Sequence, residues 1–245
     1  VEKYTQVMKV DILAFAAHPD DIELSASGTI LKHISQGKKV AIIDLTQGEL
    51  GSRGTIETRF QEASDSSKIL GLSDRTNLKM ADGFFEINPQ NLTLIIEQIR
   101  KYQPEIVLAN APSDRHPDHG RGSELVSRAC FLAGLLKIET SLDGVQQEKW
   151  RPKAVYKYIQ DRYLKPDFVV DVSDFVEQKM ESILAFKTQF FDPNSDAPET
   201  PISGKTFLEF ITSRMREFGR PIGAEYAEGF VVERTLGVDN LFDLK

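Results

Sequence analysis

The sequence predicts an α/β fold with a mainly parallel sheet, helices on both faces of the sheet and a less regular C-terminal portion. Short apolar runs alternate with amphipathic stretches over the first 136 residues, which is typical of parallel strands joined by right-handed crossovers. The first run, VDILAFAA at 10–17, is almost wholly apolar, as expected of a strand buried on both faces. A chain of 245 residues, 40% of them hydrophobic, is long enough to bury a large core.

Helix signals divide the first half of the chain into strand–helix units. Gly37 and Gly71 are placed as helix stops, and Thr55 and Thr58 as helix caps. Pro89 stands near the start of a helix, where proline is well tolerated. The elements expected here are strands at 10–17, 39–46, 77–81 and 105–111 and helices at 22–35, 55–71, 89–103 and 122–136.

The second half is less regular. Residues 191–205 (FDPNSDAPETPISGK) are expected to form a loop, because they are rich in proline and polar residues. The remaining elements expected are strands at 154–160, 167–173 and 228–234 and helices at 176–190 and 205–219.

Composition argues against several classes of protein. The net charge of −7 argues against nucleic acid as a general partner, since phosphate binding requires a basic field. No apolar run approaches the roughly 20 residues that span a bilayer, so no membrane partner is expected. The one cysteine, Cys130, excludes an internal disulfide and indicates a reducing cytoplasm. No stretch resembles a linker, so we predict one domain over 8–245, with 1–7 as an extension of no assigned function.

Residues that carry chemistry gather where the predicted strands end. Ligands of an open parallel sheet bind outside the carboxyl ends of its strands. The loops that follow the first four strands are 18–23, 46–55, 82–86 and 113–122. Three of the four histidines in the chain fall in two of these loops. This clustering predicts a site at one edge of the sheet.

The motif HPDD has the form of half a metal site. His18 precedes a proline and is held extended, while Pro19 can open a helix. His18 and Asp21 are three residues apart across that bend and can both reach one ion. Asp20 lies between them, points differently and can hold a water.

The motif HPDH supplies what the first motif lacks. His116 and His119 are again three residues apart with a proline between them. Two histidines and one carboxylate leave an open coordination position, which is the pattern of a catalytic Zn²⁺ site. Zinc lowers the pKa of its bound water to near neutrality, and a nearby carboxylate can take the proton.

Each motif taken alone has a plainer explanation. An aspartate after a strand, such as Asp20 or Asp21, often only caps a helix. The glycine-rich turn with Arg53 can be merely flexible, Arg115 can be a solvated charge, and Asp82 can form an Asx turn. On this edge of the sheet, though, the arginines can also grip carboxylates or sugar hydroxyls, and Asp82 can accept hydrogen bonds from hydroxyls. All three are therefore candidate substrate-binding residues.

The two histidine motifs resemble a known family, the LmbE-like (PIG-L) superfamily of zinc-dependent N-acetylglucosaminyl deacetylases. The resemblance rests on AHPDDIE, followed by HPDH, and runs from Met8 to Glu233. The segments TQGELGSRGT, ADGFFE, NAPSDRHPDHG, PISG and EYAEGF are similar to the branch that deacetylates N-acetylglucosaminyl malate in bacillithiol biosynthesis. Membership implies a Rossmann-like fold and a homo-oligomer, either a trimer or a hexamer.

The resemblance also implies a role for each motif residue. Position by position, His18, Asp21 and His119 would be the metal ligands and Asp20 the general base. His116 would stabilise the oxyanion as an imidazolium, and Asp118 would be the acid that orients this imidazolium. Arg53 and Asp82 would bind the sugar. Some relatives have a tyrosine two residues before the equivalent of His116. That position is Asp114 here, so help for the oxyanion must come from another group.

The sequence thus predicts a deacetylase that releases acetate from an N-acetylglucosaminyl conjugate. N-acetylglucosaminyl malate is the first candidate, another conjugate or a chitooligosaccharide is the alternative, and Fe²⁺ is an alternative to Zn²⁺. A non-haem iron oxygenase also uses two histidines and a carboxylate, but the strand–helix alternation argues against it. A receiver-like signalling module would use the acidic pair for Mg²⁺, and would leave three histidines idle.

Overall fold

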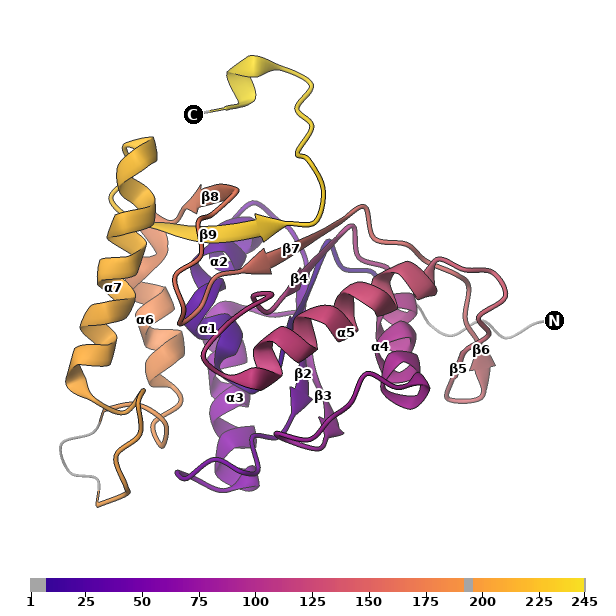
Figure 1. The fold of residues 1–245 in the computed structure, drawn as a ribbon, viewed down its shortest axis with the longest axis horizontal. Coiled ribbons are helices and arrows are strands. Elements are labelled where there is room, and N and C mark those ends of the chain that lie inside the picture. The colour runs from indigo at the N-terminus through magenta and orange to yellow at the C-terminus, as the bar shows by residue number, and fades with distance from the viewer. Residues whose placement is uncertain (1–7, 192–195, 245) are drawn as a thin grey trace.

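The computed structural model describes residues 8–191 and 196–244, so the extension 1–7 and part of the predicted 191–205 loop lie outside the described residues (Figure 1). The helices and strands are β1 Ile12–Ala16, α1 Asp21–Ser25, α2 Ser27–Ser35, β2 Val40–Thr46, α3 Ile56–Leu70, β3 Asp74–Met80, α4 Pro89–Tyr102, β4 Ile106–Ala109, α5 Pro117–Ala133, β5 Ser141–Leu142, β6 Val145–Gln146, β7 Ala154–Tyr158, β8 Phe168–Asp171, α6 Val176–Leu184, α7 Lys205–Gly219 and β9 Ala227–Val232. Short 3₁₀ turns lie at Ser173–Phe175, Arg220–Ile222 and Leu241–Asp243.

Seven strands form one sheet in the order β3-β2-β1-β4-β7-β9-β8. The neighbours from β3 to β7 are all parallel, and β9 pairs antiparallel with both β7 and β8. The predicted mainly parallel sheet is therefore confirmed. The less regular C-terminal portion is the antiparallel edge, where the chain crosses from β7 to β8 and returns through α7 to β9.

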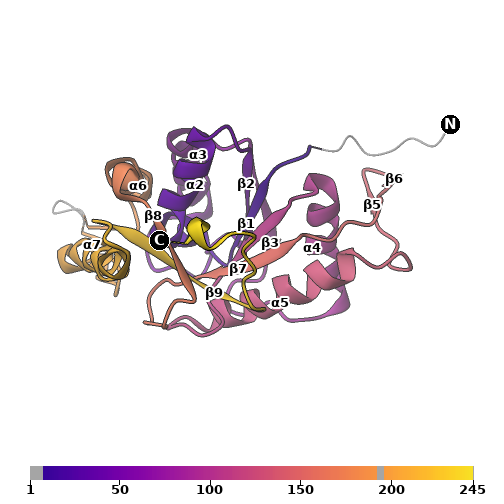
Figure 2. The ribbon, with the colours of Figure 1, turned by 90° about the horizontal axis from the view of Figure 1, so that it is seen from above.

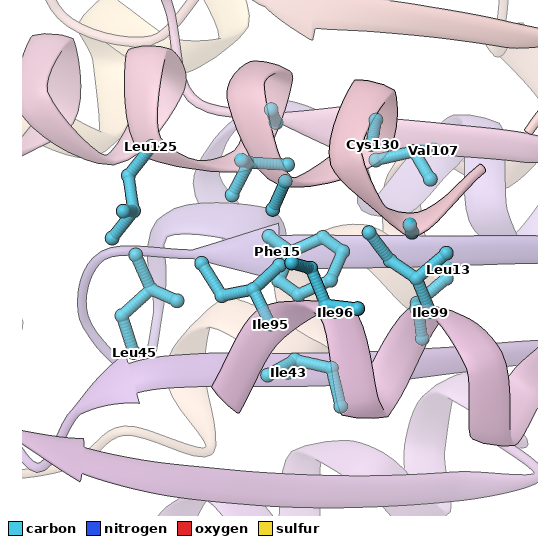
Figure 3. Packing of buried hydrophobic residues seen from close by; sticks show 14 of the residues in the cluster. Leu13, Phe15, Ile43, Leu45, Ile95, Ile96, Ile99, Val107, Leu125 and Cys130 are labelled. Carbon is cyan, nitrogen blue, oxygen red and sulfur yellow. The ribbon is translucent and has the colours of Figure 1, made fainter. Parts of the chain in front are cut away.

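Helices cover both faces of the sheet, as predicted (Figure 2). Alternate residues of β1 point to opposite faces. Leu13 and Phe15 pack into the core beneath α4 and α5, while Ile12 and Ala14 pack into the core beneath α1 and α2. Figure 3 shows the first core, in which side chains of both helices meet those of β1 and β2.

Three helices agree closely with the prediction, among them the predicted helix at 89–103, which is α4, and another differs. The predicted helix at 55–71 is α3, whose Thr55 cap accepts the N–H of Thr58 in a reciprocal capping box and whose end has Gly71 in the left-handed conformation. The predicted helix at 205–219 is α7 with the same bounds. The predicted helix at 22–35 is instead two helices that break at Ala26 (φ −135°).

The helix after β4 starts earlier than predicted. α5 begins at Pro117, with His116 as its N-cap, because proline fits the first turn of a helix. The HPDH motif is therefore helical from its second residue. α6 ends at Leu184, well before the predicted end at 190. The hairpin of β5 and β6 was not predicted, although its turn, Asp143-Gly144 with both φ positive, is a strong hairpin signal.

No helix in the described part of the chain combines the length and the apolar character needed to cross a membrane.

The α4 layer gives a test of the fold. Ile99 on α4 is fully buried in the core shown in Figure 3, whereas Leu94 on the same helix is exposed. We expect Ile99→Ala to lower the free energy of unfolding by about 2–5 kcal/mol, and Leu94→Ala to lower it by about 1 kcal/mol or less. Urea denaturation measures both values, and equal losses would contradict the packing of α4 on β1.

Candidate active site

The candidate site lies at the topological switch point of the sheet. From β1 the chain moves outward through β2 to β3, and then returns to place β4 on the other side of β1. The loops that leave β1 and β4 therefore diverge and open a crevice between them. Asn110, buried at the end of β4, bridges the two loops: its Oδ1 accepts the N–H of Ala17 at 2.9 Å, and its Nδ2 donates to Asp21 Oδ2 at 3.0 Å.

The HPDD segment is tightly bent. The backbone N–H of His18 donates to Asp21 Oδ2 at 3.0 Å, which closes the turn into α1. Asp20 has φ 124° and ψ −18°, a conformation sparsely populated by residues other than glycine. Strain of this kind costs of the order of 1–3 kcal/mol and is concentrated at functional sites. Asp20 is also buried.

Asp21 and three imidazole rings come together in the crevice. The ring centroids of His18, His116 and His119 lie 4.5 to 5.6 Å apart. Asp21 Oδ1 is 3.2 Å from His119 Nε2, and Asp21 Oδ2 is 3.8 Å from His18 Nδ1. Gln160, just after β7, donates to Asp21 Oδ1 at 2.8 Å. The structure thus brings together the three residues predicted as metal ligands.

Among the described residues, two groups of side chains have donor atoms that all lie close enough together to hold an ion, and the predicted set of His18, Asp21 and His119 is not one of them. One nitrogen from each of the three histidines lies within 4.8 Å of the others, and so do donor atoms of His18, Asp82 and Asp118. The first group contains two predicted ligands and replaces Asp21 with His116. All of these combinations include His18, which follows β1 closely.

A second layer of carboxylates orients the imidazoles. His119 Nδ1 is 2.7 Å from Asp114 Oδ2, and His18 Nε2 is 3.1 Å from Asp82 Oδ1 and 3.4 Å from Asp118 Oδ2. Carboxylates that hold the second nitrogen of a metal-binding histidine fix its tautomer and orientation. Asp114 therefore has a positioning role that the sequence did not reveal.

Asp118 contacts His116 through its backbone. Its N–H donates to His116 Nδ1 at 3.2 Å, while its carboxylate accepts hydrogen bonds from Gly83 N at 2.8 Å and Arg121 Nη1 at 2.7 Å. Since His116 Nδ1 is an acceptor, a neutral ring carries its proton on Nε2. We expected the carboxylate of Asp118 to orient His116. In the structure, the hydrogen bond to His116 comes from the backbone N–H of Asp118.

Burial and charge shift the pKa values of the four central groups in different directions. Burial alone would lower the pKa of His18 and His119, but contacts with Asp118 and Asp82 raise that of His18 to about 10, and Asp21 with Asp114 raises that of His119 to about 9. The same pairing outweighs the burial of Asp21 and lowers its pKa far below the usual range. Burial and the neighbouring rings lower the pKa of His116, which favours the neutral ring over the expected imidazolium.

The carboxyl group of Asp20 has a pKa near neutrality. Burial raises its pKa to about 7, against the lowering effect of the Arg59 guanidinium. Arg59 Nη2 lies 3.2 Å from Asp20 Oδ2 and also donates to the carbonyl of Pro19, and Nη1 donates to Gln189 at 2.9 Å. A carboxyl group that titrates near neutral pH can both accept and return a proton.

A cavity of about 230 Å³ opens beside these groups. Asp82 and Arg115, two of the three residues predicted to bind substrate, line it, and Arg115 Nε donates to Asp161 at 3.0 Å. Arg53 is not among the described lining residues. Its guanidinium donates to the carbonyls of Thr188 at 2.6 Å and Pro198 at 3.2 Å, so it ties the glycine-rich turn to a later loop.

Sequence reasoning missed several residues of the site. Arg59 lines the cavity, which Arg53 was expected to do, and its signal was its position one turn after the Thr55 cap, where α3 begins at the same edge of the sheet. Asn110 and Asp114 stood in the segment NAPSDRHPDHG, but neither was given a positioning role there. Gln160 follows β7, beyond the four loops in which the sequence placed the chemistry.

Comparisons with known proteins show which proteins the chain is similar to. The family model described as GlcNAc-PI de-N-acetylase (PIG-L) matches residues 13–130. A diacetylchitobiose deacetylase from Thermococcus kodakarensis is 28% identical over 240 residues, which cover 93% of this chain and 84% of that protein. A probable N-acetyl-α-D-glucosaminyl L-malate deacetylase 2 from Bacillus anthracis is 26% identical over 73% of this chain and 81% of its own length. The crystal structure of a conserved protein from Thermus thermophilus superimposes with a TM-score of 0.82 at 34% identity, covering 94% of this chain and 98% of that one.

Proposed function

We propose that the protein uses a divalent metal to hydrolyse the N-acetyl group of an N-acetylglucosaminyl conjugate. The premise is that the chain belongs to the PIG-L (LmbE-like) family and is an N-deacetylase. The observation that carries the proposal is the meeting of His18, Asp21 and His119 from two separate loops, beside Asp20 with its pKa of about 7.

The donor set fits a catalytic metal. Two imidazoles and one carboxylate suit Zn²⁺ and equally suit Fe²⁺. Asp21 favours the predicted set over the three-histidine group, because both of its oxygens face a histidine ring and its pKa is lowered far below the usual range. Asp114 behind His119 and Asp82 behind His18 supply the outer contacts that metal-binding histidines require. When bound, the metal would polarise the acetyl carbonyl and lower the pKa of a water.

The residues of the chain would then move the protons. Asp20 accepts one proton as water attacks the carbonyl carbon, and returns it to the nitrogen as the C–N bond breaks. Acetate and the free glucosamine amine leave. His116, protonated on Nε2, donates a hydrogen bond to the oxyanion, a contact typically worth a few kcal/mol. Arg59 holds the Asp20 carboxylate and stands at the wall of the cavity.

A buried acceptor supports an amide as substrate. Gln160 Oε1 has no hydrogen-bond partner among the described residues, while its Nε2 is fixed by Asp21. An unsatisfied buried acceptor is costly, and an amide N–H of a substrate would satisfy it. The rival signalling module has no use for this acceptor or for the three histidines. The rival oxygenase would be supported only by turnover that depends on oxygen.

The aglycone has two candidates. N-acetylglucosaminyl malate, the candidate expected from the sequence, needs cations at the cavity for its carboxylates. Arg115 and Arg59 line the cavity, but both already contact a carboxylate, and Arg53 binds backbone carbonyls instead. This shortage of available cations favours the second candidate, a neutral chitooligosaccharide such as diacetylchitobiose. The homo-oligomer and the cytoplasmic location stay predictions.

A substrate assay separates the candidates. We expect the zinc-loaded enzyme to release acetate from at least one of N-acetylglucosaminyl malate, diacetylchitobiose and N-acetylglucosamine, and to lose this activity when a chelator removes the metal. A preference for the malate conjugate would support the substrate that the sequence predicts first, N-acetylglucosaminyl malate. No acetate from any N-acetylglucosaminyl compound would contradict the proposed function.

The general base can be tested by its pH dependence. We expect Asp20→Asn to keep its metal and to lose roughly 10²–10⁴-fold in kcat. In the wild type, kcat/KM should fall below about pH 7, since Asp20 must be ionised to accept a proton. Arg59→Gln removes a charge that lowers the pKa of Asp20, so this fall should begin at higher pH than in the charge-conserving control Arg59→Lys. An acid limb that does not move would argue against Asp20 as the base.

Metal content distinguishes the predicted set of His18, Asp21 and His119 from the set of three histidines. We expect Asp21→Asn and His119→Ala to lose most of the zinc that the wild type binds. His116→Ala should keep its zinc and lose turnover. Equilibrium dialysis with elemental analysis measures the bound zinc, an acetate-release assay measures turnover, and circular dichroism checks that each variant is folded. Zinc lost in His116→Ala and kept in Asp21→Asn would favour the three-histidine site.

A further inference from the structure

The cavity extends beyond the groups that the proposed chemistry uses. It continues beneath α7 and past β9, where the lining is mainly apolar. The side chains that α7 contributes recur at helical spacing and so share one face of the helix. We call this part the inner arm and define it by Leu24, Ile202, Phe207, Ile211, Met215 and Phe218.

The residues of the inner arm are buried or half-buried, whereas two residues that line the cavity near the histidines are exposed. Ile211, Met215 and Phe218 are at most 5% exposed. Near the histidines, Leu50 is 62% exposed, and the side chain of Arg115 is 46% exposed. A ligand can therefore enter beside Leu50 and Arg115, while α7, whose lining residue Phe210 is 37% exposed, borders the inner arm.

Charged groups along the inner arm are occupied by the protein itself. Lys179 donates to Glu228 at 2.8 Å and to two backbone carbonyls at 3.0 Å. Glu228 also accepts two N–H groups at the start of α2. Arg214 donates at 2.6 Å to the carbonyls of Gln160 and Asp161. Their hydrogen-bonding groups already have protein partners, so the inner arm suits an apolar group and not a sugar.

The inner arm begins at the metal-binding loop. Leu24 lies one helical turn after Asp21 on α1, and Ser25 follows it. Ser25 Oγ is buried and has no partner among the described residues, as is the case for Gln160 Oε1. These two polar atoms mark the junction where an amide would sit, with apolar surface on its inner side and Asp82 and Arg115 on its outer side.

We propose that the inner arm binds the acyl chain of the substrate, so that the enzyme hydrolyses N-acyl groups longer than acetyl. This inference rests on the proposed function. In an N-acylated amino sugar, the amide joins a polar sugar to an apolar acyl chain. The cavity likewise has polar residues on one side of the proposed amide position and the apolar inner arm on the other. Water would add to the acyl carbonyl carbon, the C–N bond would break, and a fatty acid would leave in place of acetate, with the proton passing to the amine.

The test compares acyl chains on one glucosaminyl conjugate, the one that releases acetate fastest. We expect kcat/KM for N-butanoyl and N-hexanoyl forms to exceed that for the N-acetyl form, by up to about fourfold for each buried methylene. Met215→Trp fills the inner arm and should reverse this order. Ser213→Trp, on the exposed side of α7, is the matched control and should keep it. Ile211→Phe replaces Met215→Trp if that variant does not fold.

Three outcomes would overturn the inference. Hydrolysis of the N-acetyl form alone would overturn it and leave the proposed function intact. Faster hydrolysis of octyl N-acetylglucosaminide, with no gain from longer acyl chains, would assign the inner arm to an apolar aglycone. If no conjugate is hydrolysed, the proposed function fails. Binding of acetate and of hexanoate to the zinc-loaded wild type, measured by calorimetry, then tests the inner arm separately. Hexanoate should bind more tightly than acetate, and equal affinities would overturn it.

Discussion

The carboxylate of Asp21 is the point on which the site depends. It accepts hydrogen bonds from His18 N, Asn110 and Gln160, and it faces the ring of His119. The first three partners follow β1, β4 and β7, and His119 lies in the first turn of α5, so one buried oxygen pair joins loops that are far apart in the sequence. A buried charge is costly unless it is paired and hydrogen-bonded. The loops can therefore close only if these partners, or a metal among them, surround Asp21.

The same arrangement separates two neighbouring aspartates by function. Asp21 is paired with imidazoles and stays ionised, while Asp20 is buried beside Arg59 and has a pKa of about 7. Two carboxylates whose surroundings move their pKa values apart can take different parts in proton transfer. The positive φ of Asp20 is the local cost of placing both in one turn.

Local patterns in the sequence predicted much of the fold and the centre of the site. Buried strands such as 39–46, the capped helix α3 and the motifs HPDD and HPDH are each marked by a few adjacent residues. The remaining features depend on partners distant in the chain. Arg59 reaches Asp20 only because α3 packs beside the first loop, and Gln160 reaches Asp21 only because β7 lies next to β4. Arg53 was placed by its motif, but its contacts were decided by the loop around Thr188.

The most direct test is to locate the metal itself. Crystals soaked in zinc and measured at the zinc absorption edge would show the ion as an anomalous peak. We expect this peak about 2.0–2.2 Å from a nitrogen of His18, a nitrogen of His119 and an oxygen of Asp21, with His116 outside the coordination sphere. A peak bound by His116 instead of Asp21, or one among His18, Asp82 and Asp118, would contradict the assignment of Asp21 as the ligand that joins the two loops.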